Sequence, residues 1–160
     1  MGRIVCATRG GEAGRRTQER AIALAKERGT GLIFLCVFDP SFAGDLNKAL
    51  SAAVKEEQQW LGRALMGVAQ ARAREQGVEA DAVVLGGPIL DSIEEFLCQS
   101  GASTLVIGEA KADSALSAFR HGTIQSCAAH VEQNTNVEVI VVTPAGNEVG
   151  EPPARPASND

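Results

Sequence analysis

A regular alternation of two sequence patterns most limits the folds open to this 160-residue chain. Short apolar runs, typical of buried strands, alternate with longer stretches whose apolar residues recur at helical spacing. The strand-like runs are residues 3–8, 32–38, 78–85, 103–108 and 137–143, and the helical stretches are residues 14–28, 46–77, 89–99 and 122–133. This alternation predicts an α/β fold. Crossovers between parallel strands are right-handed, which places helices on both faces of the sheet. We expect a doubly wound five-stranded parallel sheet with helices on both faces.

The patterns within individual segments predict where each lies in the sheet. Residues 32–38 are almost continuously apolar, which is typical of a parallel strand buried on both faces. Residues 78–85 alternate instead, which favours a place nearer the sheet edge. Trp60 falls on the apolar stripe of the second helical stretch, and we expect it to pack against the sheet.

Composition and charge exclude several classes of protein. Aromatic residues make up only 4% of the chain, so the core must be aliphatic. The net charge of −5 disfavours nucleic-acid binding, because such a chain gains nothing from counterion release. No signal peptide precedes the first strand, and no apolar run approaches the roughly 20 residues of a membrane span. We therefore expect a cytoplasmic protein without a membrane partner, folded over residues 1–145, with a disordered Pro-containing tail over 146–160.

The four cysteines do not form a recognisable metal or redox motif. Cys6, Cys36, Cys98 and Cys127 lie far apart, without a C-x-x-C pair. Cys6 and Cys36 fall within strand-like runs, where a thiol serves as a small buried apolar side chain. We predict no metal site.

Turn-forming and polar residues gather where the predicted strands end. Thr8, Asp39, Gly86 and Gly108 each follow or close a strand. Open parallel sheets bind ligands at this edge, where the strand order reverses. The Gly122-Thr123 pair opens the last helix, so free backbone N–H groups and a hydroxyl are available to an anion there.

The chain resembles the universal stress protein family over residues 3–143. The segments that carry the resemblance are residues 3–8, 32–37, the Gly86-Gly87-Pro88 turn, 105–108, Gly122-Thr123 and 139–144. The resemblance implies the strand order 3-2-1-4-5, with the reversal between strands 1 and 4. It also implies dimers that pair their fifth strands, here Val137 to Thr143.

Many members of the family bind ATP, and the resemblance implies which residues would hold it. The family's motif after the fourth strand has three glycines and then Ser or Thr; Gly108, Gly122 and Thr123 match it, but Lys111 replaces the middle glycine. Val37 would place its backbone against the adenine. At the end of strand 1, Thr8 replaces the family's Asp, so no carboxylate is present there to hold Mg²⁺. Lys111 adds bulk but also a positive charge, as do Arg9, Arg15 and Arg16 near the same rim.

Each of these residues also has a purely structural interpretation. Gly108 can simply end a strand, Thr123 can cap a helix, and Asp39-Pro40 is a common turn pair. Three functions therefore stay open at this stage. The first is a stress-response regulator that binds ATP or a related adenine nucleotide. The second is a dimeric interaction module without nucleotide, and the third is a slow ATPase, although no catalytic constellation is present.

Overall fold

The computed structural model describes residues 2–9, 11–39, 48–108, 124–143 and 148–149. Within them the chain alternates strand and helix, as the sequence predicts. The elements are β1 (Ile4–Ala7), α1 (Gly11–Arg28), β2 (Leu32–Phe38), α2 (Lys48–Glu75), β3 (Ala80–Gly86), α3 (Ile89–Ser100), β4 (Thr104–Gly108), α4 (Ile124–Thr135), β5 (Glu138–Val142) and β6 (Glu148–Val149). Gly29 ends α1 at a φ of 63°, a conformation that costs glycine little.

The sheet has the expected order, extended by one short strand. The order is β3-β2-β1-β4-β5-β6, and β1 to β5 are all parallel, which confirms the predicted five-stranded core. The prediction that β3 lies at an edge is also confirmed.

β6 corrects one expectation. The sequence places Glu148 and Val149 in a disordered tail, whereas the structure pairs them antiparallel with Val142 and Val141 of β5. The free hydrogen-bonding groups along the edge of β5 and the apolar side chain of Val149 explain this pairing. The sequence does not predict it because the surrounding segment is rich in Pro. The remainder of the predicted tail lies outside the described residues.

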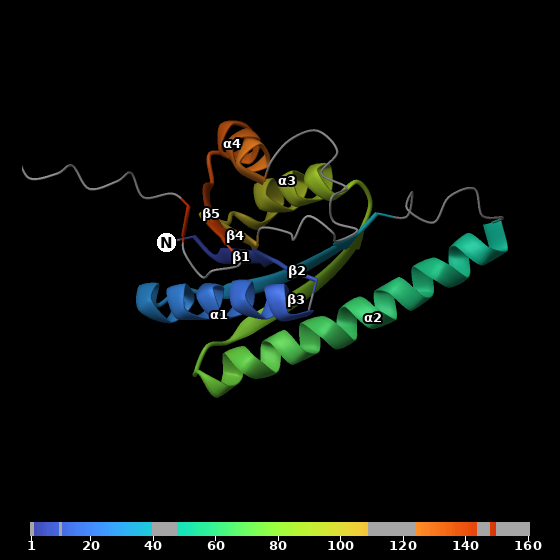
Figure 1. Ribbon diagram of the computed structural model, residues 1–160, viewed down its shortest axis with the longest axis horizontal. Helices are drawn as coiled ribbons and strands as arrows, with labels where there is room; N and C mark the ends of the chain where they lie inside the picture. The colour runs from blue at the N-terminus through green and yellow to red at the C-terminus, as the bar shows by residue number, and fades with distance from the viewer. Residues whose placement is uncertain (1, 10, 40–47, 109–123, 144–147, 150–160) are drawn as a thin grey trace, which may run out of the picture.

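Helices cover both faces of the sheet, with α1 and α2 on one face and α3 and α4 on the other (Figure 1). Alternate strand residues supply two aliphatic layers: Ile4 and Cys6 point toward α1 and α2, whereas Val5 points toward α3 and α4. Cys6 and Cys36 are both fully buried, as expected. None of the helices in the described part of the chain is long and apolar enough to span a membrane.

The predicted role of Trp60 is wrong. Its side chain is 68% exposed and does not pack on the sheet. The buried residues of α2 are Gly62, Met66, Ala69 and Ala73. A Cβ on Gly62 would lie 2.8 Å from Phe38 and Val84, so a glycine is what lets the helix approach β2 and β3 closely. Helix α2 has a second, exposed set of apolar residues that includes Trp60, and it overlaps the buried set in the sequence. Periodicity alone therefore does not show which set faces the sheet.

Candidate functional site

The sheet reverses its winding between β1 and β4. The chain leaves β1 through α1 to reach β2 on one side, and it leaves β4 through α4 to reach β5 on the other. In the parallel register Ala7 lies beside Ile107, so Thr8 and Gly108 follow at the same carboxyl edge. A crevice outside this edge is where an open α/β sheet binds a ligand.

Thr8 is buried, and its hydroxyl faces α1. Its Oγ1 accepts a 3.1 Å hydrogen bond from Nε2 of Gln18 and lies 3.5 Å from the Gly14 carbonyl, to which it donates. Oε1 of Gln18 in turn accepts a 2.7 Å hydrogen bond from Arg72 of α2. The Thr8 side chain therefore holds the start of α1 in place, in addition to any contact it makes in the crevice.

Gly108 is required by packing. A Cβ at this position would overlap Oγ1 of Thr17, a residue of α1 that is only 2% exposed. Gly14 has a similar role, since a Cβ there would lie 2.9 Å from Oγ1 of Thr8. The close approach of α1 to the carboxyl ends of β1 and β4 explains why both positions are glycine. Of the two, only Gly108 is identified from the sequence as a candidate site residue.

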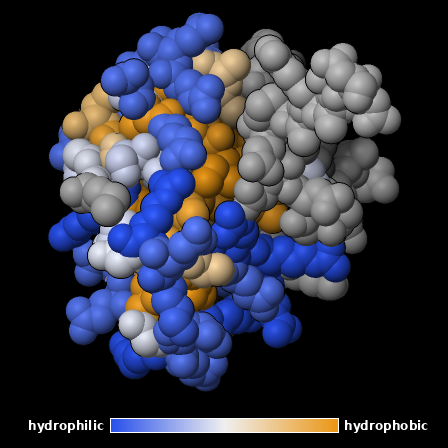
Figure 2. Space-filling model, turned by 90° about the vertical axis from the view of Figure 1, so that its left-hand side faces the viewer, coloured by the Kyte–Doolittle hydropathy of each residue, from blue (hydrophilic) through white to orange (hydrophobic). Residues whose placement is uncertain are grey.

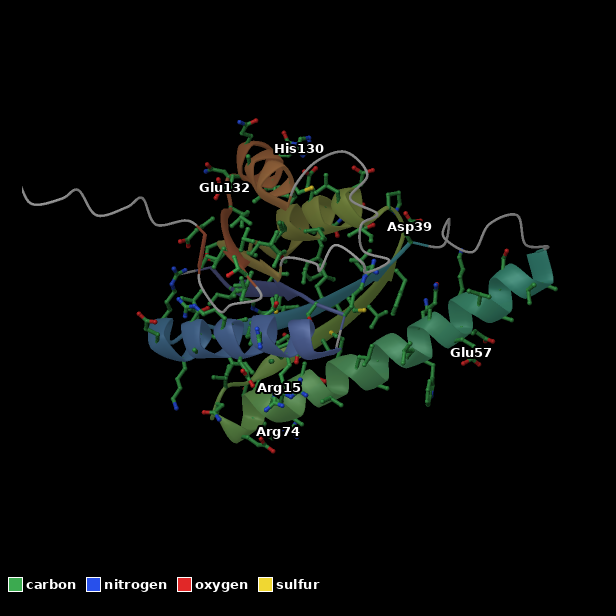
Figure 3. All side chains as sticks on the ribbon, viewed as in Figure 1. Arg15, Asp39, Glu57, Arg74, His130 and Glu132 are labelled. Carbon is green, nitrogen blue, oxygen red and sulfur yellow. The ribbon has the colours of Figure 1, made fainter. Side chains whose placement is uncertain are left out.

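Arg9 and Asp39 bring opposite charges to the edge beside Thr8. Burial lowers the pKa of Arg9, while Cys36 and Asp39 act in the opposite direction. Burial likewise raises the pKa of the Cys36 thiol to about 11, which the Arg9 charge partly offsets. Arg9 remains a cation at neutral pH and Cys36 a neutral thiol. Figure 3 shows Asp39 where β2 ends.

The other predicted site residues are distributed over the same edge and beyond it. Val37 is buried in the layer facing α3 and α4. Gly86 ends β3 in register with Phe38, and a Cβ there meets its nearest atom at 3.9 Å, so packing does not require glycine. Lys111, Gly122 and Thr123 lie outside the described residues. Arg15, a predicted rim cation, pairs with Glu19 on the surface of α1 at 2.9 Å.

The residues that sequence reasoning missed are Thr17, Gln18 and Arg72. Gln18 is 1% exposed and lies on the same helical stripe as Ala21 and Ala25. A polar residue within an apolar stripe is the signal that could have identified it. Among the described residues there is no group of three or more His, Cys, Asp or Glu side chains that could hold a metal ion.

A separate hollow of about 560 Å³ lies at the opposite edge, where β2 and β3 begin. Arg3, Arg74, Glu79 and Asp81 line it with balanced charges, and Arg3 pairs with Asp81 at 3.2 Å. Figure 2 shows the side of the molecule at the left of Figure 1, where hydrophilic residues surround hydrophobic ones. This hollow contains none of the predicted site residues.

The fold is a doubly wound α/β domain whose strand order reverses between its first and fourth strands. The model of the universal stress protein family matches residues 1–143, and the chain belongs to that family. No protein with a curated description matches it significantly in sequence.

Solved structures of universal stress proteins share the fold. One in complex with cAMP is 20% identical, with a TM-score of 0.64 over 88% of this chain and 96% of that one. One from Archaeoglobus fulgidus in complex with dAMP is 20% identical, with a TM-score of 0.60 over 88% of this chain and 96% of that one. One from Arabidopsis thaliana with AMP bound is 13% identical, with a TM-score of 0.58 over 89% of this chain and 92% of that one.

Proposed function

We propose that this chain is a cytoplasmic stress-response regulator that binds ATP or a related adenine nucleotide in the crevice between β1 and β4. Its family and the adenine nucleotides in three similar structures support the proposal. The observation that carries it in this chain is the cation Arg9, partly buried directly after β1 and beside Asp39. A desolvated guanidinium binds a phosphate more strongly than an exposed one.

The proposed ligand spans the carboxyl edge. The adenine lies against Val37 and the ribose near Asp39, while the phosphates extend from Gly108 toward Lys111 and the Gly122-Thr123 pair that precedes α4 in the sequence. Lys111 supplies the charge that compensates for the missing middle glycine. This arrangement assigns binding but no catalytic residue.

Thr8 gives the proposal a specific consequence for metal dependence. A hydroxyl held by Gln18 cannot replace a carboxylate as a Mg²⁺ ligand. We expect nucleotide binding that changes little when Mg²⁺ is removed, with Arg9 and Lys111 neutralising the phosphates in its place.

Calorimetric titration with AMP, ADP, ATP and cAMP, each with and without Mg²⁺, tests the proposal. We expect saturable heat with at least one of the four and a dissociation constant that changes less than about threefold with Mg²⁺, which is under 1 kcal/mol. The absence of heat and of a thermal shift at millimolar concentrations of all four nucleotides would contradict the proposed nucleotide binding.

The second candidate is a dimeric interaction module that binds no nucleotide. The engagement of Thr8 by Gln18 favours it, because that hydroxyl already has a structural partner. Its expected dimer pairs the β5 strands of two copies, but β6 pairs with β5 at Val141 and Val142. In such a dimer β6 must therefore leave, or pairing is restricted to the start of β5. Deleting residues 148–160 would strengthen this dimer and leave nucleotide titration unchanged.

A further inference from the structure

Helix α2 carries a continuous exposed strip of apolar and small residues. Trp60 is 68% exposed, Val68 50% and Leu61 46%. Between Leu50 and Ala71 the nine positions of this face are all exposed, and only one is polar: Leu50, Ala53, Glu57, Trp60, Leu61, Ala64, Gly67, Val68 and Ala71. We call these nine residues the α2 strip. Exposed apolar surface of this length marks an interaction site on a water-soluble domain.

The α2 strip faces away from the sheet. At 100° per residue, its centre lies about 170° from the centre of the buried face formed by Gly62, Met66, Ala69 and Ala73. Figure 3 shows Glu57, a member of the strip, pointing away from the sheet. Among the described residues, no helix or strand packs against this face.

The first half of α2 has little tertiary support of its own. None of residues 49–61 is buried, and this half projects past the sheet (Figure 1). An isolated helix of this length is marginal in water, and helical stability in proteins comes mainly from packing an apolar face. The strip continues without interruption from this projecting half onto the half anchored against the sheet.

We propose that the α2 strip is a dimer interface whose occupant is α2 of a second copy, running antiparallel about the midpoint between Trp60 and Leu61. In this arrangement the projecting half of each helix lies on the anchored half of the other. Large residues meet small ones, because Leu50 lies opposite Ala71 of the partner subunit and Val68 opposite Ala53 of the partner subunit. One surface serves both copies, as a two-fold interface requires.

Charges on the edge of the strip select this direction. Glu56 and Arg63 are seven residues apart, two helical turns, and therefore share one edge on either side of Trp60. In this antiparallel register Glu56 lies within two residues, about 3 Å along the helix axis, of the level of Arg63 of the partner subunit, and the symmetry repeats the pair. Parallel two-fold pairing would set this edge against the opposite edge of the partner helix, so Glu56 and Arg63 would not meet. Glu57, the polar member of the strip, lies within one residue of the level of the same partner cation.

Sedimentation of the full chain, combined with fluorescence, tests the interface. Trp60 is the only tryptophan, so its emission reports directly on this surface. We expect a concentration-dependent dimer, with a blue shift and reduced acrylamide quenching as the dimer forms. Trp60→Ser should weaken dimerisation by about 30-fold or more, as removal of a central interface tryptophan does. Gln59→Ser, on an exposed position of the same helix outside the strip, should leave it unchanged.

Charge exchange tests the antiparallel direction without removing apolar contacts. Glu56→Arg and Arg63→Glu should each weaken the dimer, and the double variant should restore it. Circular dichroism checks that each variant is folded. A monomer at all concentrations, a dimer unaffected by Trp60→Ser, or a double variant weaker than both single variants would overturn the proposal.

Discussion

The side-chain amide of Gln18 donates a 3.1 Å hydrogen bond to the hydroxyl of Thr8 and accepts one of 2.7 Å from Arg72. The contact joins the carboxyl end of β1 to α1 and, through Arg72, to α2. The family resemblance implies that Thr8 lies at the ligand. The structure shows that the Thr8 hydroxyl also has a structural partner inside the domain. The carboxyl end of β1 is therefore held by a polar connection that the sequence motif does not contain.

Removing the Gln18 amide should destabilise the fold. Gln18→Leu keeps the side chain's approximate size but leaves the buried Thr8 hydroxyl and the Arg72 donor without this partner. We expect the free energy of unfolding to fall by about 2–3 kcal/mol. Urea denaturation measures it, with Gln99→Leu as the control, because Gln99 is exposed and donates a hydrogen bond to Glu95 within α3. A loss no larger than that of the control would contradict the role assigned to Gln18.

A side chain at position 108 should be destabilising because of Thr17. The Cβ of Gly108→Ala would overlap Oγ1 of Thr17, and we expect a loss of about 1–3 kcal/mol in unfolding free energy. The double variant with Thr17→Ala should recover part of that loss, giving a positive coupling in a double-mutant cycle. Gly86→Ala is the matched control, since its Cβ has room. Equal effects of the two alanines would refute a steric origin.

The buried Cys36 thiol should make the fold sensitive to alkali. Its pKa rises from 9.0 to about 11 on folding, so the unfolded chain loses this proton first. Stability from this thiol is complete below pH 9 and is lost as the pH rises to about 11, because the folded state holds the proton longer. Cys36→Ala should reduce the slope of unfolding free energy against pH in that window by roughly 1.4 kcal/mol per pH unit. Cys98, which is exposed, provides the control substitution, and an unchanged slope in Cys36→Ala would count against the assignment.

Arg9 should contribute to nucleotide affinity through its charge. Arg9→Gln keeps a polar side chain but removes the cation beside the phosphates, and we expect affinity to fall roughly 10- to 100-fold. Arg74→Gln is the matched control, because Arg74 lies in the hollow at the other edge of the sheet. Titration calorimetry compares them. Equal affinities for Arg9→Gln and wild type would remove Arg9 from the site.

The sequence predicts the fold well because alternation of apolar runs directly reflects strands and helices. The runs at residues 32–38 and 103–108 are confirmed as central strands, and the strand order follows from the family resemblance. Trp60 is misplaced because α2 has two apolar faces, and periodicity cannot tell which one meets the sheet. β6 is not predicted because a strand of two residues is too short to show a hydrophobic periodicity, and the segment around it is rich in Pro.

The sequence predicts which described residues lie at the carboxyl ends of the strands, but not the contacts that those residues make. Turn residues mark the carboxyl edges, so Thr8, Asp39 and Gly108 are found from the sequence. The partners Thr17 and Gln18 come from a helix whose approach distance depends on Gly14 and Gly108 together, and such a three-dimensional fit leaves no linear motif. Lys111, Gly122 and Thr123 stay predictions.

A crystal structure of the chain grown with a saturating adenine nucleotide tests the central claim most directly. The account predicts density for the nucleotide at the carboxyl edge between β1 and β4, with the adenine against Val37 and a phosphate within hydrogen-bonding distance of Arg9. An empty crevice at saturating nucleotide, or a nucleotide bound only at the opposite edge near Arg74, would contradict it.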